Sequence, residues 1–219
     1  MPTSRSYGDA CGIARALDVV GERWALLVAR ELLLGPQRFT DLRRALPAAS
    51  SNLVADRLRE LEGHGVIRRR KLPPPAGSQV YELTAWGHEL EPILVALGDW
   101  GVRGTVAPDP ASLSATSALL ALRSYARPAP DAPHAICQLA LDDRTWAAEI
   151  AAGQVLIGPA GPARPDASLR TDPKTLAAML GNPGAFDTAI ADGRAEISGD
   201  PRALRLLLQN AALPPPAAA

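Results

Sequence analysis

Residues 38–83 constrain the fold more than any other part of the chain, because two helical patterns and two strand patterns follow one another there at short intervals. The apolar side chains of the helical segments recur at the spacing of one buried helix face: Phe39, Leu42 and Leu46 in the first, then Val54, Leu58 and Leu61 in the second. Pro47 ends the first helix, because proline cannot donate the next helical hydrogen bond. Ser50 or Ser51 can cap the second helix by accepting from an unpaired backbone N–H, and Gly63 and Gly65 end it. The pattern predicts a helix–turn–helix.

A basic hairpin follows the two helices. Val66–Leu72 and Gln79–Leu83 have the composition of strands, and a loop rich in Pro and Gly separates them. The first strand carries the basic run Arg68–Lys71. A helix–turn–helix followed by a basic hairpin is a winged helix, so this stretch predicts DNA binding.

The outer face of the second helix is short and polar at its start, as an element that enters the DNA major groove must be. We expect this face to contact bases or phosphates, and the hairpin to contact backbone phosphates. The predicted DNA-binding residues are Arg38, Ser50, Ser51, Asn52, Arg59, Arg69, Arg70 and Lys71. The alternatives are an ordinary exposed helix face and a solvated strand end.

The distribution of charge supports this interpretation better than the total does. The formal net charge is zero, which by itself argues against a nucleic-acid binder. Residues 38–71, however, hold nine basic and four acidic side chains, whereas residues 105–219 hold nine basic and eleven acidic ones. A locally basic segment on a neutral chain is typical of a site-specific regulator.

Other function classes lack their signatures. The start does not resemble a signal peptide and no apolar run is long enough to span a bilayer, so we expect a cytoplasmic protein without membrane contact. Two cysteines, Cys11 and Cys137, lack metal-ligand spacing and indicate a reducing compartment. The loop at 158–165 lacks the lysine and hydroxyl residue of a phosphate-binding loop. We predict no metal, no cofactor and no enzymatic activity.

Two helices flank the winged helix and predict a homodimer. Cys11 begins a short helix through Val20, and residues 22–34 form an apolar helix closed by Gly35. Thr84 is placed to cap a helix over 85–100, which Pro92 should kink. An apolar stripe on that helix needs a partner, because a winged helix has no surface of its own to cover it: Leu90, Ile93, Leu94, Leu97 and Trp100.

The chain is predicted to be an α+β protein with a winged helix-turn-helix domain followed by a smaller α+β domain. Residues 1–104 form the DNA-binding and dimerisation domain, 105–114 a linker rich in Gly, Pro and Ser, 115–212 the second domain, and 213–219 a disordered tail. In the second domain the pattern predicts helices at 115–126, 172–180, 185–191 and 200–211, and strands at 135–141, 145–150, 154–157, 167–170 and 194–198.

The first hundred residues resemble the HxlR family of winged-helix regulators, relatives of the MarR group. The matching motifs are Gly21-Glu22-Arg23-Trp24, Gly35-Pro36, Arg38-Phe39-x-x-Leu42, Leu58-Arg59-Glu60-Leu61-Glu62 with Gly65-Val66-Ile67, and Tyr81-x-Leu83-Thr84-x-x-Gly87. The resemblance implies a homodimer that binds a palindromic operator in double-stranded DNA. Asp56 lies where the family more often has a neutral or basic residue, so the operator sequence does not carry over.

Cys11 matches a position through which some members of that family sense oxidants or electrophiles. The family often has Cys-Pro where this chain has Cys11-Gly12. A helix N-terminus lowers the pKa of a thiol, and a disulfide would need Cys11 of the other subunit. The alternative is a small apolar residue at a dimer interface.

Residues 115–212 are similar to a sterol-carrier-protein (type 2) domain. The matching segments are Thr171-Asp172-Pro173-x-Thr175-Leu176 and Ala191-Asp192-Gly193-Arg194-x-Glu196-Ile197-x-Gly199-Asp200, with the closing helix. Such domains enclose an apolar cavity, which implies an apolar small-molecule effector. Met179, Phe186 and Ile190 are the candidate pocket residues, although a filled core is the alternative. Cys137, in an apolar strand, is expected to be buried and inert.

Three hypotheses remain open. The leading one is a homodimeric transcriptional regulator whose second domain binds an apolar effector. The second keeps DNA binding, makes Cys11 the sensor and gives the second domain a structural role. The third is a carrier or enzyme whose winged helix contacts protein, and absence of salt-sensitive DNA binding would favour it.

Overall fold

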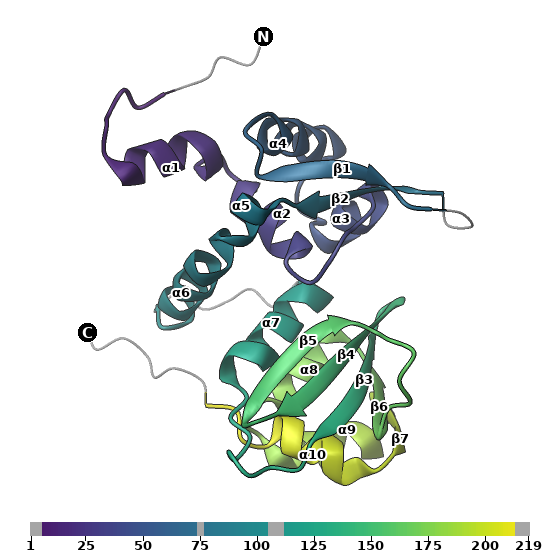
Figure 1. Cartoon of the computed structure of the whole chain (residues 1–219). Coiled ribbons are helices and arrows are strands. Elements are labelled where there is room, and N and C mark those ends of the chain that lie inside the picture. Colours follow the sequence, from purple (N-terminus) through teal and green to yellow (C-terminus); the bar gives the residue numbers. More distant parts are fainter. Residues whose placement is uncertain (1–5, 74–76, 105–111, 213–219) are drawn as a thin grey trace. The chain divides into compact units, whose positions relative to one another are not determined.

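The computed structural model describes residues 6–73, 77–104 and 112–212. The chain forms two compact units, Met1–Leu97 and Gly98–Ala219, and the protein has the α+β composition expected from the sequence (Figure 1). Most of the predicted linker and all of the predicted tail, residues 105–111 and 213–219, lie outside the described residues.

The first unit contains the predicted helix–turn–helix and hairpin. Its elements, with α6 running on past Leu97, are α1 (Gly12–Val20), α2 (Ala25–Leu32), α3 (Phe39–Ala45), α4 (Ser51–Gly63), β1 (Ile67–Lys71), β2 (Gln79–Leu83), α5 (Ala85–His88) and α6 (Leu90–Val102). Strands β1 and β2 pair antiparallel, with Ile67 opposite Leu83 and Lys71 opposite Gln79.

The predicted inward faces of α3 and α4 are buried. Leu42, Val54, Leu58 and Leu61 are at most 1% exposed, whereas Phe39 is half-buried, and α2 contacts both helices. Burying a leucine side chain contributes about 1.5–3 kcal/mol. The apolar periodicity therefore identified the face of α4 that packs into the core.

Gly65, rather than Gly63, ends α4. Gly63 is the last helical residue, and Gly65 has a φ of 77°, a conformation that glycine adopts without steric cost. The Gly65 N–H donates to the Glu62 carbonyl at 3.0 Å and the Val66 N–H to the Leu61 carbonyl at 2.9 Å. This Schellman arrangement satisfies the last carbonyls of α4 and turns the chain directly into β1.

A short bridge adds the segment before α3 to the hairpin. The Gln37 N–H donates to the Tyr81 carbonyl at 2.9 Å, and the Tyr81 N–H donates to the Gln37 carbonyl at 2.8 Å. The buried Gln37 side chain also donates to the Glu31 carbonyl. The sequence pattern did not predict this third, one-residue strand.

Two helix predictions were wrong. The helix predicted over 22–34 begins only at Ala25, because Trp24 has a φ of 80°. The helix predicted over 85–100 is broken at Glu89 into α5 and α6. Pro92 is consequently the third residue of α6 and lies in its first turn, where the backbone N–H needs no helical partner, so it causes no mid-helix kink.

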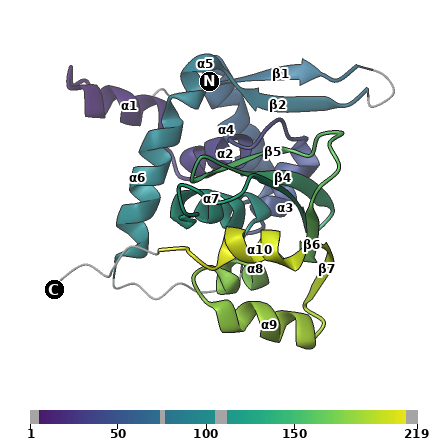
Figure 2. The same cartoon turned by 60° about the horizontal axis from the view of Figure 1, so that its bottom comes forward.

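The second unit is a five-stranded sheet with helices packed against it. After the end of α6, its elements are α7 (Ala115–Tyr125), β3 (Ala135–Leu141), β4 (Arg144–Ala151), β5 (Gln154–Pro159), β6 (Ala167–Thr171), α8 (Pro173–Met179), α9 (Pro183–Ala191), β7 (Ala195–Gly199) and α10 (Pro201–Leu208). The strand order is β5-β4-β3-β6-β7, in which β3 and β6 are parallel and the other neighbours antiparallel. Figure 2 shows α8, α9 and α10 grouped together.

One face of this sheet forms the core of the second unit. Alternate residues of β3 are buried, as are Trp146 and Ile150 of β4, and α7 and α10 contact strands of the sheet. The β3 side chains that point to the other face, such as Gln138, are half-buried. The predicted strands are thus confirmed with small differences in their ends.

Aspartate or asparagine followed by proline begins α8, α9 and α10. Asp172 accepts from the Lys174 and Thr175 N–H groups at 2.9 and 3.0 Å, which satisfies donors that a helix start leaves unpaired. The last helix ends at Leu208, three residues earlier than predicted, because the chain then pairs with the segment after α7. There the Ala212 N–H donates to the Tyr125 carbonyl at 2.9 Å.

Candidate nucleic-acid interface

Arg43 fixes the turn between α3 and α4. Its Nε donates to the Ser51 Oγ at 3.0 Å, and its Nη1 donates to the carbonyls of Leu46 and Ala49. The Leu53 N–H donates to the Ser50 Oγ at 3.2 Å, so Ser50 is the cap that the sequence left open between two serines. The sequence treated Arg43 only as a positive charge, because its bonds depend on where the turn carbonyls lie.

The exposed face of α4 carries the predicted recognition residues. Ser50, Ser51 and Asn52 are exposed at the N-terminus of the helix, and Arg59 is exposed farther along it. Arg59 forms an ion pair with Asp56 three residues earlier. Asp56, which departs from the family pattern, is therefore paired with a base-contact candidate and is not an isolated negative charge.

Arg57 is not available to DNA. It is 8% exposed, and its Nη1 lies 2.8 Å from Glu60 Oε2 and 3.3 Å from Glu22 Oε2. Glu22 lies in the turn between α1 and α2, so Arg57 ties that turn to α4. The basic charge counted along residues 38–71 includes this structural arginine.

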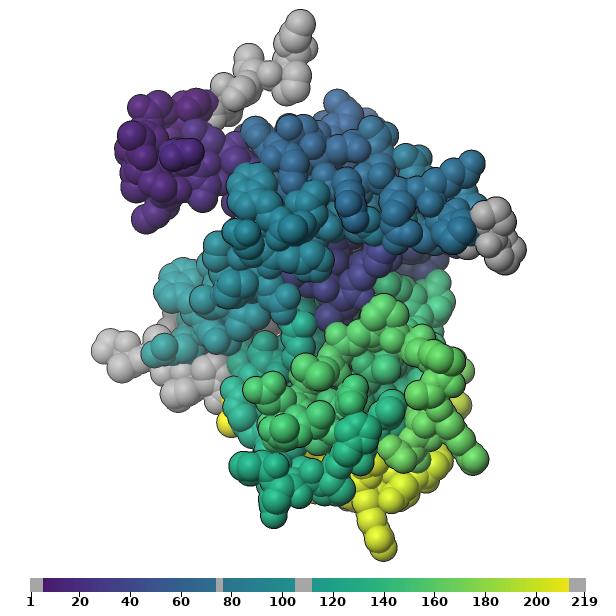
Figure 3. Space-filling view, viewed as in Figure 1, coloured from purple at the N-terminus to yellow at the C-terminus, as the bar shows by residue number. Residues whose placement is uncertain are grey.

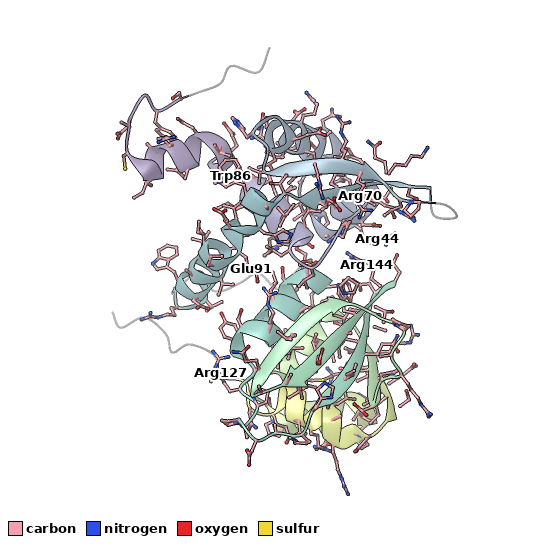
Figure 4. The ribbon with its side chains drawn as sticks, viewed as in Figure 1. Arg44, Arg70, Trp86, Glu91, Arg127 and Arg144 are labelled. Atoms are coloured by element: carbon pink, nitrogen blue, oxygen red, sulfur yellow. The ribbon has the colours of Figure 1, made fainter. Side chains whose placement is uncertain are left out.

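Two carboxylates pair with the three arginines of the hairpin. Arg68 and Arg70 donate from Nε to Glu82 Oε1 and Oε2 at 2.8 and 2.9 Å. Arg69 donates from Nε to Glu62 Oε1 of α4 at 2.8 Å, which raises the pKa of Arg69. Figure 4 labels Arg70 on the hairpin, which stands out from the first unit in Figure 3. A shallow hollow at its surface is lined by Arg69, Arg70, Lys71, Gly77 and Gln79.

The structure brings most, but not all, of the predicted DNA-binding residues together. Ser50, Ser51, Asn52 and Arg59 share one helix, and the Arg69–Glu62 ion pair joins the hairpin to the end of that helix. Arg38 belongs to another element, the start of α3, where its N–H donates to Asp41 Oδ2 at 3.1 Å.

The two cysteines have opposite environments. Cys11 is exposed at the N-terminus of α1, where the backbone N–H groups of Ala14 and Ile13 lower the pKa of its thiol. Cys137 is buried in β3, and burial together with the charge of Asp166 raises its pKa to about 12. A thiol that remains protonated at neutral pH is a poor nucleophile, as expected for Cys137.

The candidate effector residues lie in the apolar interior of the second unit. Met179 and Phe186 are fully buried and Ile190 is half-buried. Within residues 6–73, 77–104 and 112–212, no group of His, Cys, Asp or Glu side chains is arranged to hold a metal ion. No helix in the described parts of the chain has both the length and the apolarity to cross a bilayer.

A polar-faced helix beside a basic hairpin defines a winged-helix transcriptional regulator, and comparison with known proteins agrees. The family model described as HxlR-like helix-turn-helix matches residues 19–107. An HTH-type transcriptional regulator of Synechocystis, sll1512, is 39% identical over 97 residues, which cover 42% of this chain and 72% of that protein. The chain belongs to the HxlR-like helix-turn-helix family.

Two further matches are a named regulator of Bacillus subtilis and a solved structure with a redox-related title. YodB, an HTH-type transcriptional regulator of Bacillus subtilis, is 32% identical over 85 residues, covering 39% of this chain and 76% of YodB. The solved structure called redox regulator HypR in its oxidised form is 31% identical, covers 44% of this chain and all of that chain, and has a TM-score of 0.41.

Proposed function

We propose that this protein is a homodimeric, sequence-specific transcriptional regulator that binds a palindromic DNA operator through α4 and the hairpin β1–β2. One observation carries the proposal: the exposed polar face of α4 and the basic strand β1 belong to one compact unit and are joined by the Arg69–Glu62 ion pair. A helix of this kind enters the major groove while a basic hairpin follows the phosphate backbone.

The proposed contacts follow from side-chain chemistry. Asn52 and Arg59 contact base edges, since asparagine pairs with adenine and arginine with guanine through two hydrogen bonds. Arg59 exchanges its partner Asp56 for a base when it does so. Backbone phosphates are the partners of Arg38, Ser50, Ser51, Arg69, Arg70 and Lys71.

The proposed dimer interface consists of the exposed apolar faces of α1 and α6. Leu97 and Trp100 of α6 are 46% and 76% exposed, and α6 has no buried residue. In Figure 1 the N-terminal end of α1 projects from its unit, although the helix contacts α4, and of its residues only Val20 is buried. A two-fold dimer places two α4 helices about one DNA turn apart, as a palindrome requires.

The proposed domain boundaries are 1–104 and 115–212, with the second a sterol-carrier-like domain that binds an apolar effector. The apolar layer between the sheet and its helices supports this assignment. Because Met179 and Phe186 are buried, a ligand that contacts them must displace neighbouring apolar side chains.

A second candidate function is thiol-based sensing through Cys11, with a structural second domain. The observation in its favour is that the thiol is exposed at a helix N-terminus that lowers its pKa. The printed name of HypR describes a redox regulator, and that chain is matched over its whole length.

The experiment that tests DNA binding replaces Arg69, Arg70 and Lys71 together with alanine. Affinity for every DNA sequence should fall, and the slope of log affinity against log salt should become shallower by about 0.9 for each lost phosphate contact. Fluorescence anisotropy with labelled duplexes at several salt concentrations measures both quantities.

A matched control removes three exposed cations from the second unit: Arg164, Lys174 and Arg202. This control should retain the parent's slope. Equal slopes for the parent and the hairpin variant would mean that the hairpin does not contact the DNA backbone. A parent without salt-sensitive binding would contradict the proposed function altogether.

A further inference from the structure

Glu82 lies beneath two arginines of the hairpin. It stands directly opposite Arg68 in the strand register, and Arg70 follows two residues along on the same face of β1. Its side chain is 12% exposed, whereas those of Arg68 and Arg70 are 66% and 43% exposed. The carboxylate is therefore shielded from water by the guanidinium groups that it binds.

This carboxylate remains ionised at neutral pH. Burial alone would raise the pKa of Glu82, but hydrogen bonds from Arg70 and Arg68 outweigh that effect and hold the pKa below its usual value. Charge-assisted hydrogen bonds of this kind are about twice as strong as neutral ones.

Glu62 plays the corresponding part on the other face of β1. It lies near the end of α4 and accepts from Arg69, which points to the opposite side of the strand from Arg68 and Arg70. Each face of the basic strand thus has its own carboxylate. The four consecutive cations of β1 therefore face two anions, one from the hairpin itself and one from α4, and their net positive charge is reduced accordingly.

Each arginine gives its Nε to the carboxylate, and a guanidinium has further N–H donors on its Nη atoms. The arginines can therefore reach phosphates while they remain paired, although the field that attracts any DNA is weaker. Binding to random DNA is almost entirely electrostatic, whereas specific binding also uses base contacts.

We propose that Glu82 and Glu62 set the DNA specificity of this protein by neutralising the hairpin arginines, so that stable binding depends on the base contacts of α4. The proposal rests on the DNA-binding function above and adds to it: two acidic residues, outside the set of direct DNA contacts, determine the ratio of specific to random binding.

The test compares the full-length parent with Glu82→Gln, Glu62→Gln and the double variant. Glutamine keeps the shape and removes the charge. Binding is measured across a salt series on two duplexes, one of random sequence and one selected from a random pool by the parent. Each variant should bind the random duplex several-fold more tightly at low salt, with a slope steeper by about one for each newly effective phosphate contact. The ratio of specific to random affinity should fall.

Glu196→Gln is the matched control, because Glu196 pairs with Arg170 in the second unit. It should bind both duplexes as the parent does. Thermal unfolding shows whether Glu82→Gln is folded. If Glu82→Gln is unfolded, Glu62→Gln tests the proposal independently, because its carboxylate is more exposed.

The outcomes separate the two proposals. If the parent binds DNA with a salt dependence but the variants match it in slope and in random-duplex affinity, the role of the carboxylates is refuted. Weaker binding of the random duplex by the folded variants would also overturn it, since the carboxylates would then only hold the arginines in place. A parent that binds neither duplex contradicts the proposed function itself.

Discussion

At the scale of single residues, Gly87 shows why a position of the motif accepts only glycine. It lies in α5, its N–H donates to the Thr84 Oγ1 at 3.0 Å, and an added Cβ would lie 2.0 Å from the Val66 carbonyl oxygen. Gly87→Ala must push α5 away from the root of the hairpin, which should lower the free energy of unfolding by about 1–3 kcal/mol. Urea unfolding measures this loss.

Gly63→Ala is the control for that substitution, because a Cβ there meets nothing within 4 Å and the residue is helical. It should raise stability by about 0.5–1 kcal/mol through its helix propensity. If Gly87→Ala unfolds at the same urea concentration as the parent, the close approach to Val66 is not a constraint.

The sequence located the candidate site but did not show which carboxylates pair with its arginines. The polar face of α4 and the basic run were found from local spacing, and the structure has both. The partners of the arginines were missed, because Glu82 is 12 to 14 residues away in the chain and meets them only through the hairpin register. Arg57 was counted as available charge for the same reason. Its partner Glu22 lies in the turn between α1 and α2, far from Arg57 in the sequence.

At the scale of elements, the prediction of a dimer rests on helix α6. The spacing of Ile93, Leu97 and Trp100 gives α6 an exposed apolar face. Leu97→Asp would bury an unpaired charge in the proposed interface at a cost of several kcal/mol, so light scattering should show a monomer. Leu156→Asp, at an exposed leucine of β5, should leave the mass unchanged. A dimer that survives Leu97→Asp places the interface elsewhere.

Most elements were predictable because their signals are local. Asp-Pro starts, glycine ends and alternation along strands located most helices and strands of both units to within a few residues, whereas the Asn-Pro start of α9 was missed. The break at Glu89 was not predictable, since it follows from the docking of Thr84 and Gly87 on Val66. Likewise, Trp24 has a left-handed backbone conformation, which the apolar pattern of the neighbouring residues does not indicate.

At the scale of the whole molecule, the two proposed sensors lie in different units. Cys11 belongs to the first unit, and the candidate effector residues belong to the second. A signal can change DNA binding only if it has different affinity for the DNA-competent and incompetent forms. In the proposed dimer, we expect such a signal to alter the spacing of the two α4 helices, which must match one turn of DNA.

The last prediction therefore compares Cys11→Ser with a chain that ends at Gly104. We expect Cys11→Ser to keep ligand-controlled release of DNA, because the second domain is intact. The shortened chain should bind DNA but no longer respond, because the proposed effector site is absent. DNA titrations of both proteins, with and without a long-chain fatty acid and with and without peroxide, measure the responses. If the shortened chain still responds to peroxide while Cys11→Ser responds to nothing, the exposed thiol is the sensor and the effector proposal is wrong.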